Sequence, residues 1–351
     1  MGEQLPEGKP IAAAKLDPRR YFERISESRG PIAEEEPVCL YLETTNRCNL
    51  LCTTCPRTYE ELEPPSDMSW ELFTSIADQF PKIERVVLHG VGEPMMVAEL
   101  PKMVRYLKAR GVYVLFNTNG TLMRDKKCRE LIDAGLDEMR ISLDAAEPKA
   151  FEAVRGRDLF ERILRNVKNF VALKKEMKAE KPRLSLWLTG LRETLEQLPA
   201  FIRLAHGMGV NEVHLQRLVY FERNPIGLAR PESSLFESEH VIEGKYLLEA
   251  EKVAAELGVL FDASGAAEPE ASLRRLADKT PWSLCRRPWS LMYFTAHGRA
   301  LPCCIAPFSM RGYENFTLGD ARSMPLRDIW NGAEYQRFRE ALLSDHPPQA
   351  C

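Results

Sequence analysis

The clearest chemical pattern in the chain is a group of three cysteines in one short segment. Cys48, Cys52 and Cys55 form a CxxxCxxC motif directly after an apolar run. A cubane iron-sulfur cluster has four irons, so three thiolates leave one iron open to a chelating small molecule. Structural zinc is the main alternative, but closed zinc sites use four ligands, usually in two separated pairs, and no histidine lies beside this segment. The triplet therefore predicts an iron-sulfur cluster with one open corner, unless a distant fourth ligand closes it.

Polar and glycine-containing motifs follow the next three apolar runs. Because ligands of parallel α/β folds collect at the carboxyl ends of the strands, these motifs predict one shared binding site. Each motif alone also fits a turn, a loop or a helix cap. The candidate residues are Gly92, Glu93 and Pro94 after the second run, Asn117 and Asn119 after the third, and Ser142 and Asp144 after the fourth.

A second set of cysteines occurs in the last part of the chain. Cys285 and Cys303 flank Gly298, which permits a tight hairpin turn that would bring both thiols to one face. The amphipathic segment that follows would return Cys351 to the same place. These three cysteines therefore predict a second metal site, while buried free thiols that pack as small hydrophobic side chains are the alternative.

Three further cysteines are weaker candidates. Cys304 lies beside Cys303, and we expect neighbouring residues of a strand to face opposite sides. Cys39 and Cys128 stand in a strand-like and a helix-like run without cysteine partners, so we interpret both as core residues.

Short strand-like runs alternate with longer helix-like runs from Val38 onward, which predicts parallel strands joined by helical crossovers. Glycines such as Gly111 and Gly135 stand just before a new strand, where a left-handed helix cap is expected. Six units make the expected fold an α/β open sheet or a partial (β/α)6 barrel. The strand-like runs are 38–45, 85–90, 112–118, 138–144, 183–189 and 211–218; the helix-like runs include 70–80, 104–110, 128–134, 159–177 and 198–208.

The alternation of side chains along two runs indicates what their faces do. Leu184, Leu186 and Leu188 point to one side, which suits helix packing. Trp187, with Ser185 and Thr189, points to the other, and His214 with Gln216 does the same in the next run. The polar face predicts the lining of a substrate cavity, although a satisfied polar barrel core explains it equally well.

Composition sets further bounds. The 351 residues, 44% of them hydrophobic, are enough for one large domain with a smaller appendage. Lys and Arg number 48 against 51 acidic residues, so no broad positive field favours nucleic acid or an anionic membrane as a partner. No run approaches the roughly 20 apolar residues of a membrane span, and the N-terminus lacks a signal-peptide pattern, so we expect a cytoplasmic protein.

The expected division is an extension at 1–37, the barrel at 38–261, a linker at 262–281, and a small domain at 282–351 made of a hairpin plus a helix from about Leu326 to Leu343.

Residues 38 to about 218 resemble the radical S-adenosylmethionine (SAM) superfamily, whose hallmark is this cysteine spacing in this strand-following loop. The resemblance implies that the three cysteines hold a [4Fe-4S] cluster that binds and cleaves SAM. It also implies SAM contacts: Gly92, Glu93 and Pro94 with the methionine amino group, Asn117, Asn119, Ser142 and Asp144 near the ribose and methionine, and Arg155 with the carboxylate. Thr54 replaces an aromatic residue common in the family, so the usual aromatic packing beside adenine is not expected here.

The C-terminal part resembles SPASM and twitch domains, which carry auxiliary iron-sulfur clusters. The resemblance implies that Cys285, Cys303 and Cys351 bind an auxiliary [4Fe-4S] cluster. Family members usually continue with a Cys-x-x-Cys at about Cys351, so we expect either a truncated sequence or a missing ligand.

The resemblance leaves several hypotheses about the function open. The main one is an oxidoreductase whose 5′-deoxyadenosyl radical takes hydrogen from a small polar substrate, sugar-like or aminocyclitol-like, with the auxiliary cluster accepting an electron. A maturase that modifies a ribosomally made peptide is the alternative, and an iron-sulfur electron carrier or a zinc protein is the non-enzymatic one. A reductant such as flavodoxin or ferredoxin is the implied partner. A dehydrogenation also needs a base, for which His214, Glu43 and Arg299 are the candidates.

Overall fold

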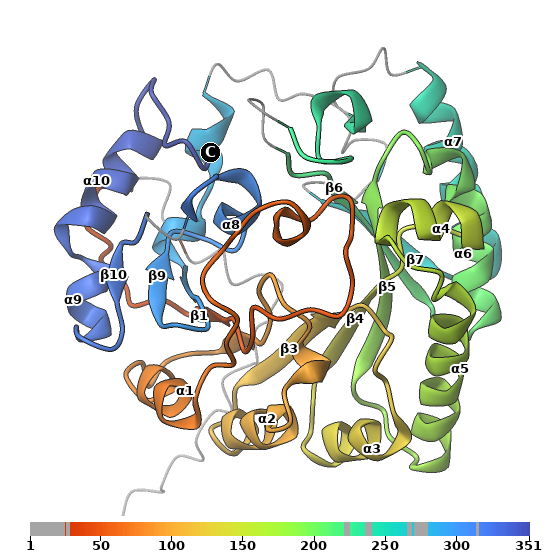
Figure 1. The fold of residues 1–351 in the computed structure, drawn as a ribbon, viewed down its shortest axis with the longest axis horizontal. Helices are drawn as coiled ribbons and strands as arrows, with labels where there is room; N and C mark the ends of the chain where they lie inside the picture. Colours follow the sequence, from red (N-terminus) through yellow and green to blue (C-terminus); the bar gives the residue numbers. More distant parts are fainter. Residues whose placement is uncertain are drawn as a thin grey trace, which may run out of the picture.

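A single sheet organises the computed structural model, which describes residues 25, 29–220, 225–235, 241–264, 269, 280–313 and 316–351. Within these residues the strand order is β10-β9-β8-β1-β2-β3-β4-β5-β6-β7, and β1 to β7 run parallel (Figure 1). The strands are β1 (Cys39–Leu42), β2 (Arg85–Val87), β3 (Tyr113–Thr118), β4 (Glu138–Ser142), β5 (Arg183–Gly190), β6 (Glu212–Arg217), β7 (Leu260–Ala263), β8 (Leu291–Phe294), β9 (Arg299–Leu301) and β10 (Gly319–Asp320).

Helices between the parallel strands cover the outer side of the curved sheet (Figure 1). They are α1 (Trp70–Ala77), α2 (Leu100–Ala109), α3 (Asp125–Asp133), α4 (Pro148–Arg155), α5 (Phe160–Glu176), α6 (Leu198–Gly207) and α7 (Val241–Leu257). Gly111 and Gly135 adopt φ of 75° and 82° between helix and strand, as the sequence predicts. The expected α/β fold of the partial-barrel type is confirmed.

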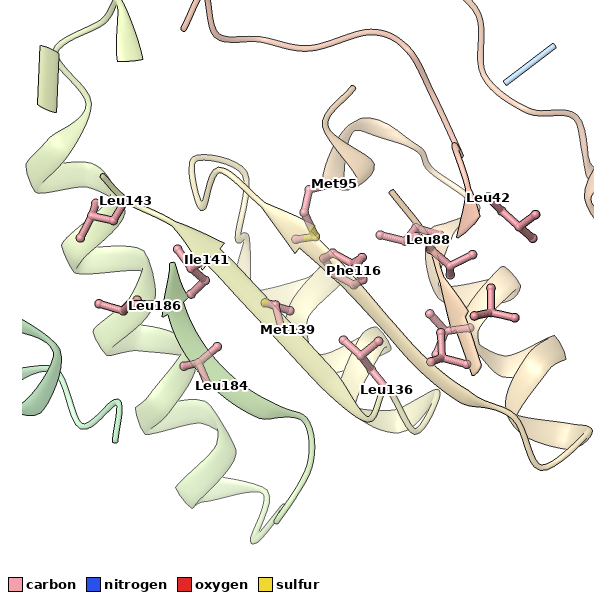
Figure 2. Packing of buried hydrophobic residues seen from close by; sticks show 14 of the residues in the cluster. Leu42, Leu88, Met95, Phe116, Leu136, Met139, Ile141, Leu143, Leu184 and Leu186 are labelled. Carbon is pink, nitrogen blue, oxygen red and sulfur yellow. The ribbon is translucent and has the colours of Figure 1, made fainter. Parts of the chain in front are cut away.

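The outer face of the strands carries the main apolar core. Leu42, Phe116, Ile141 and Leu186 come from four strands and point to the helices (Figure 2). Each such side chain contributes about 1.5–3 kcal/mol on burial. The predicted alternation of β5 is confirmed, because its leucines belong to this core whereas Trp187 faces the inside of the barrel.

The predicted number of six β/α units is one too small. β7 follows α7 and pairs in parallel with β6, so the sheet gains a seventh β/α strand. β7 also keeps the period of two, since Phe261 and Ala263 join the outer core. The predicted linker 262–281 thus begins within β7, and its residues 265–268 and 270–279 lie outside the described part of the chain.

The C-terminal segment extends the barrel sheet. β8 pairs in parallel with β1, with Cys39 opposite Leu291, while β9 pairs in antiparallel fashion with both β8 and β10. The predicted hairpin at Gly298 is confirmed by its φ of 86° and by the bond from its N–H to Thr295 O. The predicted single helix is instead two, α9 (Leu326–Trp330) and α10 (Ala333–Leu342), with α8 (Ala306–Ser309) before them.

The described end of the predicted N-terminal extension packs on this C-terminal segment. Arg29 donates to the carbonyl oxygens of Cys285 and Ser283, at 2.6 and 2.7 Å. Residues 1–24 and 26–28 of the extension lie outside the described residues. No helix in the described ranges has both the length and the apolar character that crossing a bilayer requires.

Candidate functional site

The three-cysteine segment leaves the carboxyl end of β1 and is fastened to other loops at that edge. Thr53 donates its N–H to Val154 O at 2.9 Å, and its own carbonyl accepts the N–H of Leu228 at 2.8 Å. Gly156 and Gly227 lie so close that an added Cβ would fall 2.4 Å from Leu51 O and 2.1 Å from Thr53 O, respectively. The cysteine loop is therefore held between the end of α4 and the 225–229 segment.

Arg57 fixes the inside of the same loop. Its guanidinium donates to Cys48 O at 3.0 Å and to Leu50 O at 3.1 Å. Thr58 Oγ1 also donates to Cys52 O at 2.8 Å. These bonds turn the segment back on itself, so its thiols share one region.

The thiols of this loop lie close enough to influence one another. Burial, together with the neighbouring Cys52 and Cys48, raises the pKa of Cys55 to about 12. Burial also raises the pKa of Cys48, with Glu93 and Cys52 adding to the effect. Cys48 and Cys55 therefore ionise easily only beside a strong cation, which is what iron supplies.

The donor set fits a cluster better than a single ion. In the part of the chain that the structure describes, no three Cys, His, Asp or Glu side chains converge as ligands of one metal ion. A single zinc requires that convergence, with Zn–S distances of about 2.3 Å. A cubane binds each thiolate at a separate corner, so its ligands need only surround a common volume.

The Gly92-Glu93-Pro94 segment lies directly on the cysteine loop. Gly92 leaves no room for a side chain, because a Cβ would lie 2.1 Å from Thr45 O. The N–H of Glu93 donates to Arg47 O at 2.8 Å. The Glu93 carboxylate accepts from Met95 N, Thr118 Oγ1 and Asn119 N at 2.7–2.9 Å, so it orders the loop itself. Pro94 opens the short helix η3 (Pro94–Met96) that follows.

Asp144 and Arg155 form an ion pair beside the cysteines. Arg155 pairs with Asp144 at 2.6 Å and donates to Cys52 Sγ at 3.6 Å. Asp144 adopts a left-handed φ of 64°, and its other oxygen accepts Thr189 N at 2.7 Å. Burial alone would lower the pKa of Arg155, but Asp144 and Cys52 raise it, so the guanidinium remains a fixed cation at the site.

The remaining predicted SAM contacts surround the same edge. Asn119 Nδ2 lies 3.9 Å from Cys48 Sγ and donates to Asn49 Oδ1 at 2.9 Å. Asn117 and Ser142 are half-buried at the ends of β3 and β4. Neither side chain has a hydrogen-bonding partner among the described residues, so both are available to a ligand.

Inside the barrel, aromatic and acidic side chains of β5, β6 and β7 contact one another. His214 on β6 stacks on Trp187 of β5, and the Arg140 guanidinium lies 4.4 Å from the centre of the same indole. His214 Nδ1 pairs with Asp262 on β7, while Nε2 lies 3.3 Å from Ser264 Oγ. This arrangement makes His214 the candidate base whose second nitrogen faces a hydroxyl group.

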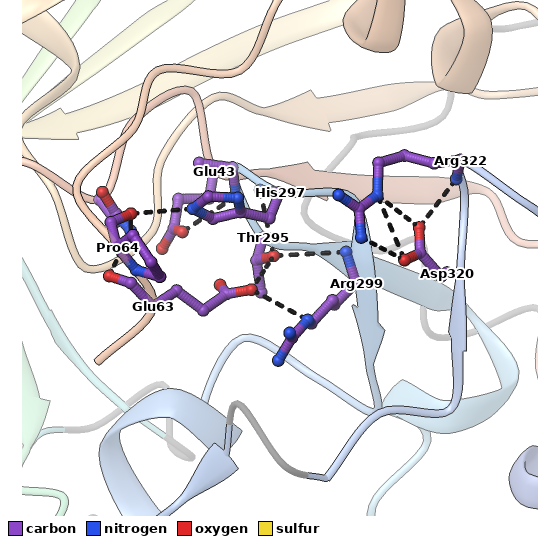
Figure 3. A network of polar contacts seen from close by, with 10 residues as sticks. Glu43, Glu63, Pro64, Thr295, His297, Arg299, Asp320 and Arg322 are labelled. Carbon is purple, nitrogen blue, oxygen red and sulfur yellow. Dashed lines mark hydrogen bonds and ion pairs between the residues drawn. The ribbon is translucent and has the colours of Figure 1, made fainter. Parts of the chain in front are cut away.

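The other two candidate bases occupy different surroundings (Figure 3). Glu43 is fully buried at the end of β1 and accepts three hydrogen bonds from the protein. Burial raises its pKa to about 7, which the three donors oppose. Arg299 on β9 pairs with Glu63 at 3.3 Å. The structure therefore places Glu43 and Arg299 in contacts with other residues of the same chain, at the junction with the C-terminal hairpin.

The second cysteine set gathers around Arg287. Burial alone would lower the pKa of this guanidinium, but Cys304, Cys303 and Cys285 raise it. Burial raises the pKa of Cys303, with Cys304, Cys285 and Cys351 among the neighbouring groups that raise it further. Ser309 Oγ donates to Ala350 O at 3.0 Å and so holds the segment that carries Cys351.

The predicted opposite facing of Cys303 and Cys304 is wrong, because β9 ends at Leu301 and both cysteines lie beyond it. Strand alternation therefore does not separate their side chains.

Several residues of the site escaped the sequence analysis. Asp262 belongs to a strand that was not predicted, and Leu228 contacts the cysteine loop from a distant segment. Arg287 follows Cys285 by two positions, and a cation so close to a cysteine in the sequence is a signal for a stabilised thiolate.

Comparison with known proteins gives consistent results. Residues 42–212 match the model of the radical SAM superfamily, and residues 285–351 match the SPASM iron-sulfur cluster-binding domain. The chain is 25% identical over 311 residues to the tungsten-containing aldehyde ferredoxin oxidoreductase cofactor-modifying protein of Pyrococcus furiosus, across 86% of this chain and 82% of that protein. It is 24% identical over 321 residues to the PqqA peptide cyclase of Granulibacter bethesdensis, across 90% and 80%.

The fold also resembles solved structures. The SAM-bound crystal structure of Streptococcus suis SuiB aligns with a TM-score of 0.65 and 15% identity over 86% of this chain and 68% of that one. An anSMEcpe structure with bound AdoMet aligns with a TM-score of 0.62 and 15% identity over 88% and 81%. Because the two family models match separate segments in the expected order, the chain belongs to the radical SAM superfamily and combines its SAM-binding [4Fe-4S] chemistry with a SPASM auxiliary iron-sulfur domain.

Proposed function

We propose that this radical SAM enzyme is a maturase that oxidatively modifies a peptide. The observation that carries the proposal is the alignment with a PqqA peptide cyclase, which spans both the barrel and the C-terminal domain. A small sugar-like or aminocyclitol-like substrate has less support from the relatives than a peptide substrate. The Pyrococcus furiosus relative is described as modifying a cofactor, so peptide modification needs a direct test.

The proposed roles follow from the two cysteine sites. Cys48, Cys52 and Cys55 would hold the cluster that binds SAM, with Arg155, Asn119 and the Gly92-Glu93-Pro94 segment around it. When bound, the cluster and SAM supply a radical that removes a hydrogen atom from the substrate. The auxiliary cluster would be held by Cys285, Cys303 and Cys351, with Cys304 as a further candidate ligand, and would take up an electron. A flavodoxin-like or ferredoxin-like reductant is the proposed partner.

His214 is the proposed proton acceptor. Asp262 holds its Nδ1, and Trp187 packs on the ring, so the imidazole has one orientation and directs Nε2 toward Ser264. Trp187 O accepts the N–H of Leu143 at 3.0 Å, directly before the Asp144 that pairs with Arg155. The proposed base is therefore linked to the proposed SAM site through Trp187, which stacks on His214 and bonds to the backbone next to Asp144.

The experiment uses anaerobically reconstituted full-length protein, SAM, a reductant and synthetic peptides encoded beside its gene. Release of 5′-deoxyadenosine together with a peptide that has lost two hydrogen atoms supports the proposal. Release of 5′-deoxyadenosine with a sugar or aminocyclitol as the oxidised product would overturn the peptide assignment. The Cys52→Ala variant serves as the inactive control, and Cys128→Ala, at a buried cysteine of α3, controls for the loss of a thiol elsewhere.

A further inference from the structure

The Glu43 carboxylate joins three segments that are far apart in the chain. Oε2 accepts the N–H of Val91 at 2.8 Å and the hydroxyl of Tyr293 at 2.9 Å, and Oε1 accepts the N–H of Ala296 at 3.1 Å. Val91 lies in the proposed SAM-binding loop, whereas Tyr293 and Ala296 lie in the C-terminal hairpin (Figure 3 draws Glu43 beside the turn of this hairpin). Glu43 itself directly follows β1 and precedes the cysteine loop.

The packing around this carboxylate is tight enough to transmit a displacement. A Cβ on Gly90 would lie 2.2 Å from Glu43 Oε2 and 2.5 Å from the Tyr293 hydroxyl oxygen. On the other side of Val91, Gly92 lies against Thr45 with the same lack of space. The loop is thus fixed at both glycines, and a movement of Glu43 requires the loop to move with it.

The negative charge of the Glu43 carboxylate makes its three hydrogen-bond donors important. Glu43 is fully buried, and an ionised carboxylate without donors is costly in such a place. Each donor lost raises that cost, so the carboxylate would seek another arrangement. Two of the three donors belong to the C-terminal hairpin, and that hairpin leads through β9 to Cys303.

We propose that Glu43 is a positioning residue through which the C-terminal hairpin holds the Gly90–Glu93 loop in the conformation that binds SAM. The inference rests on the proposed function in that the loop is taken to be a SAM-binding one. It goes further by making SAM affinity depend on Tyr293, which belongs to the opposite end of the chain. The two iron-sulfur modules are then coupled through one side chain and not only through the shared sheet.

The test compares two conservative variants of the full-length, anaerobically reconstituted protein. Tyr293→Phe removes the hydroxyl that reaches Glu43. Tyr335→Phe is the matched control, because Tyr335 is also a buried tyrosine of the C-terminal segment, but its hydroxyl reaches Leu301 O. The SAM dissociation constant is measured by calorimetry, iron content is measured in parallel, and hydrogen exchange is followed in peptides that cover residues 88–95.

We expect Tyr293→Phe to weaken SAM binding about 10-fold, since it leaves a buried carboxylate short of one donor, and to speed exchange in the 88–95 peptides. Iron content should stay at the parent level, and Tyr335→Phe should bind SAM within about twofold of the parent. Glu43→Gln, which turns an amide nitrogen toward donors, should weaken SAM binding further. If it does not fold, Tyr293→Phe still decides the question.

Parent-like SAM affinity and exchange in Tyr293→Phe would overturn the inference, as would equal losses in both tyrosine variants. Failure of the proposed function looks different. A parent protein that binds SAM but modifies no peptide leaves the coupling intact. A parent protein that does not bind SAM refutes the function, while the exchange data still decide whether Tyr293 orders the loop.

Discussion

Trp187 and His214, on adjacent strands of the barrel, stack with ring centroids 3.9 Å apart and planes inclined by 26°. The pair is in register across the sheet, and Asp262 is the residue opposite His214 on the next strand. Three neighbouring strands therefore fix one imidazole on the inner face of the sheet.

We expect His214→Gln to reduce the rate of peptide oxidation about 100-fold, because removal of a positioned base costs about 10²–10⁴-fold. Release of 5′-deoxyadenosine from SAM should continue, since His214 does not contact the cysteine loop. Both products are quantified by liquid chromatography and mass spectrometry. His206→Gln, at an exposed site on α6, is the control. Unchanged peptide oxidation in His214→Gln would rule out this base.

Removal of one thiol from the cysteine loop after β1 should abolish binding of the whole cluster there. Cys48→Ala is expected to lose about four irons per chain and all release of 5′-deoxyadenosine, because a cubane held by only two protein thiolates is not retained. Iron analysis and electron paramagnetic resonance check this. Cys128→Ala should keep the parent iron content, and an iron loss there as large as in Cys48→Ala would argue against the assigned ligands.

The C-terminal thiols should behave differently. Cys303→Ala is expected to lose auxiliary iron and peptide oxidation but to keep SAM cleavage, because Cys303 does not belong to the cysteine loop at β1. The ratio of 5′-deoxyadenosine to oxidised peptide is the measurement, and it should rise sharply. Complete loss of SAM cleavage at normal N-terminal cluster content would contradict separate roles.

Arg155 should set SAM affinity. The Arg155 guanidinium contacts both Asp144 and Cys52, and an ammonium group cannot reproduce this fork, so Arg155→Lys is expected to weaken SAM binding by about 10-fold or more. Calorimetry on reconstituted protein measures the change. Arg157→Lys, at an exposed position two residues away, should bind SAM like the parent. If both variants bind equally well, Arg155 has only its structural contact with Asp144.

His89 should make stability depend on pH. Burial, followed by the charges of Arg140 and Arg85, lowers its pKa to about 3 from the ordinary value of 6.5. A lowered folded-state pKa stabilises the fold above pH 6.5, and this contribution is lost as the pH falls from 6.5 toward 3.

Between about pH 7 and pH 5 the free energy of unfolding should therefore fall by about 2 kcal/mol more in the parent than in His89→Gln. Urea unfolding of the cluster-free protein measures it. His346→Gln, at an exposed position, should keep the parent's pH dependence. Equal slopes in the parent and His89→Gln would show that His89 titrates normally.

Local patterns predicted the parts of the fold that local physics determines. The cysteine loop, the polar strand ends and the alternation along β5 all follow from residue order. The structure places the cysteine loop and the polar residues at the carboxyl ends of the strands, and the leucines of β5 in the outer core. The positive φ of Gly298 followed from the same kind of reasoning. The division of the C-terminal helix at Asn331 and Gly332 was also readable, because an Asn-Gly pair favours a turn.

Long-range relationships could not be predicted in this way. No local signal pairs Cys39 with Leu291, because the register of two strands so far apart depends on the whole sheet. β7 has only four residues, too few for a clear period, and without it the link between His214 and Asp262 is invisible. The bond between Tyr293 and Glu43 depends on the pairing of β8 with β1 and is equally invisible to local patterns.

The pairing of β8 with β1 also limits how the chain can be shortened in the laboratory. A fragment that stopped before Leu291 would expose one edge of the Cys39–Leu42 strand, with its backbone groups unpaired and its four buried side chains partly uncovered. Bare strand edges recruit other copies of the same chain, so such a fragment should form insoluble aggregates instead of an isolated SAM-cleaving unit.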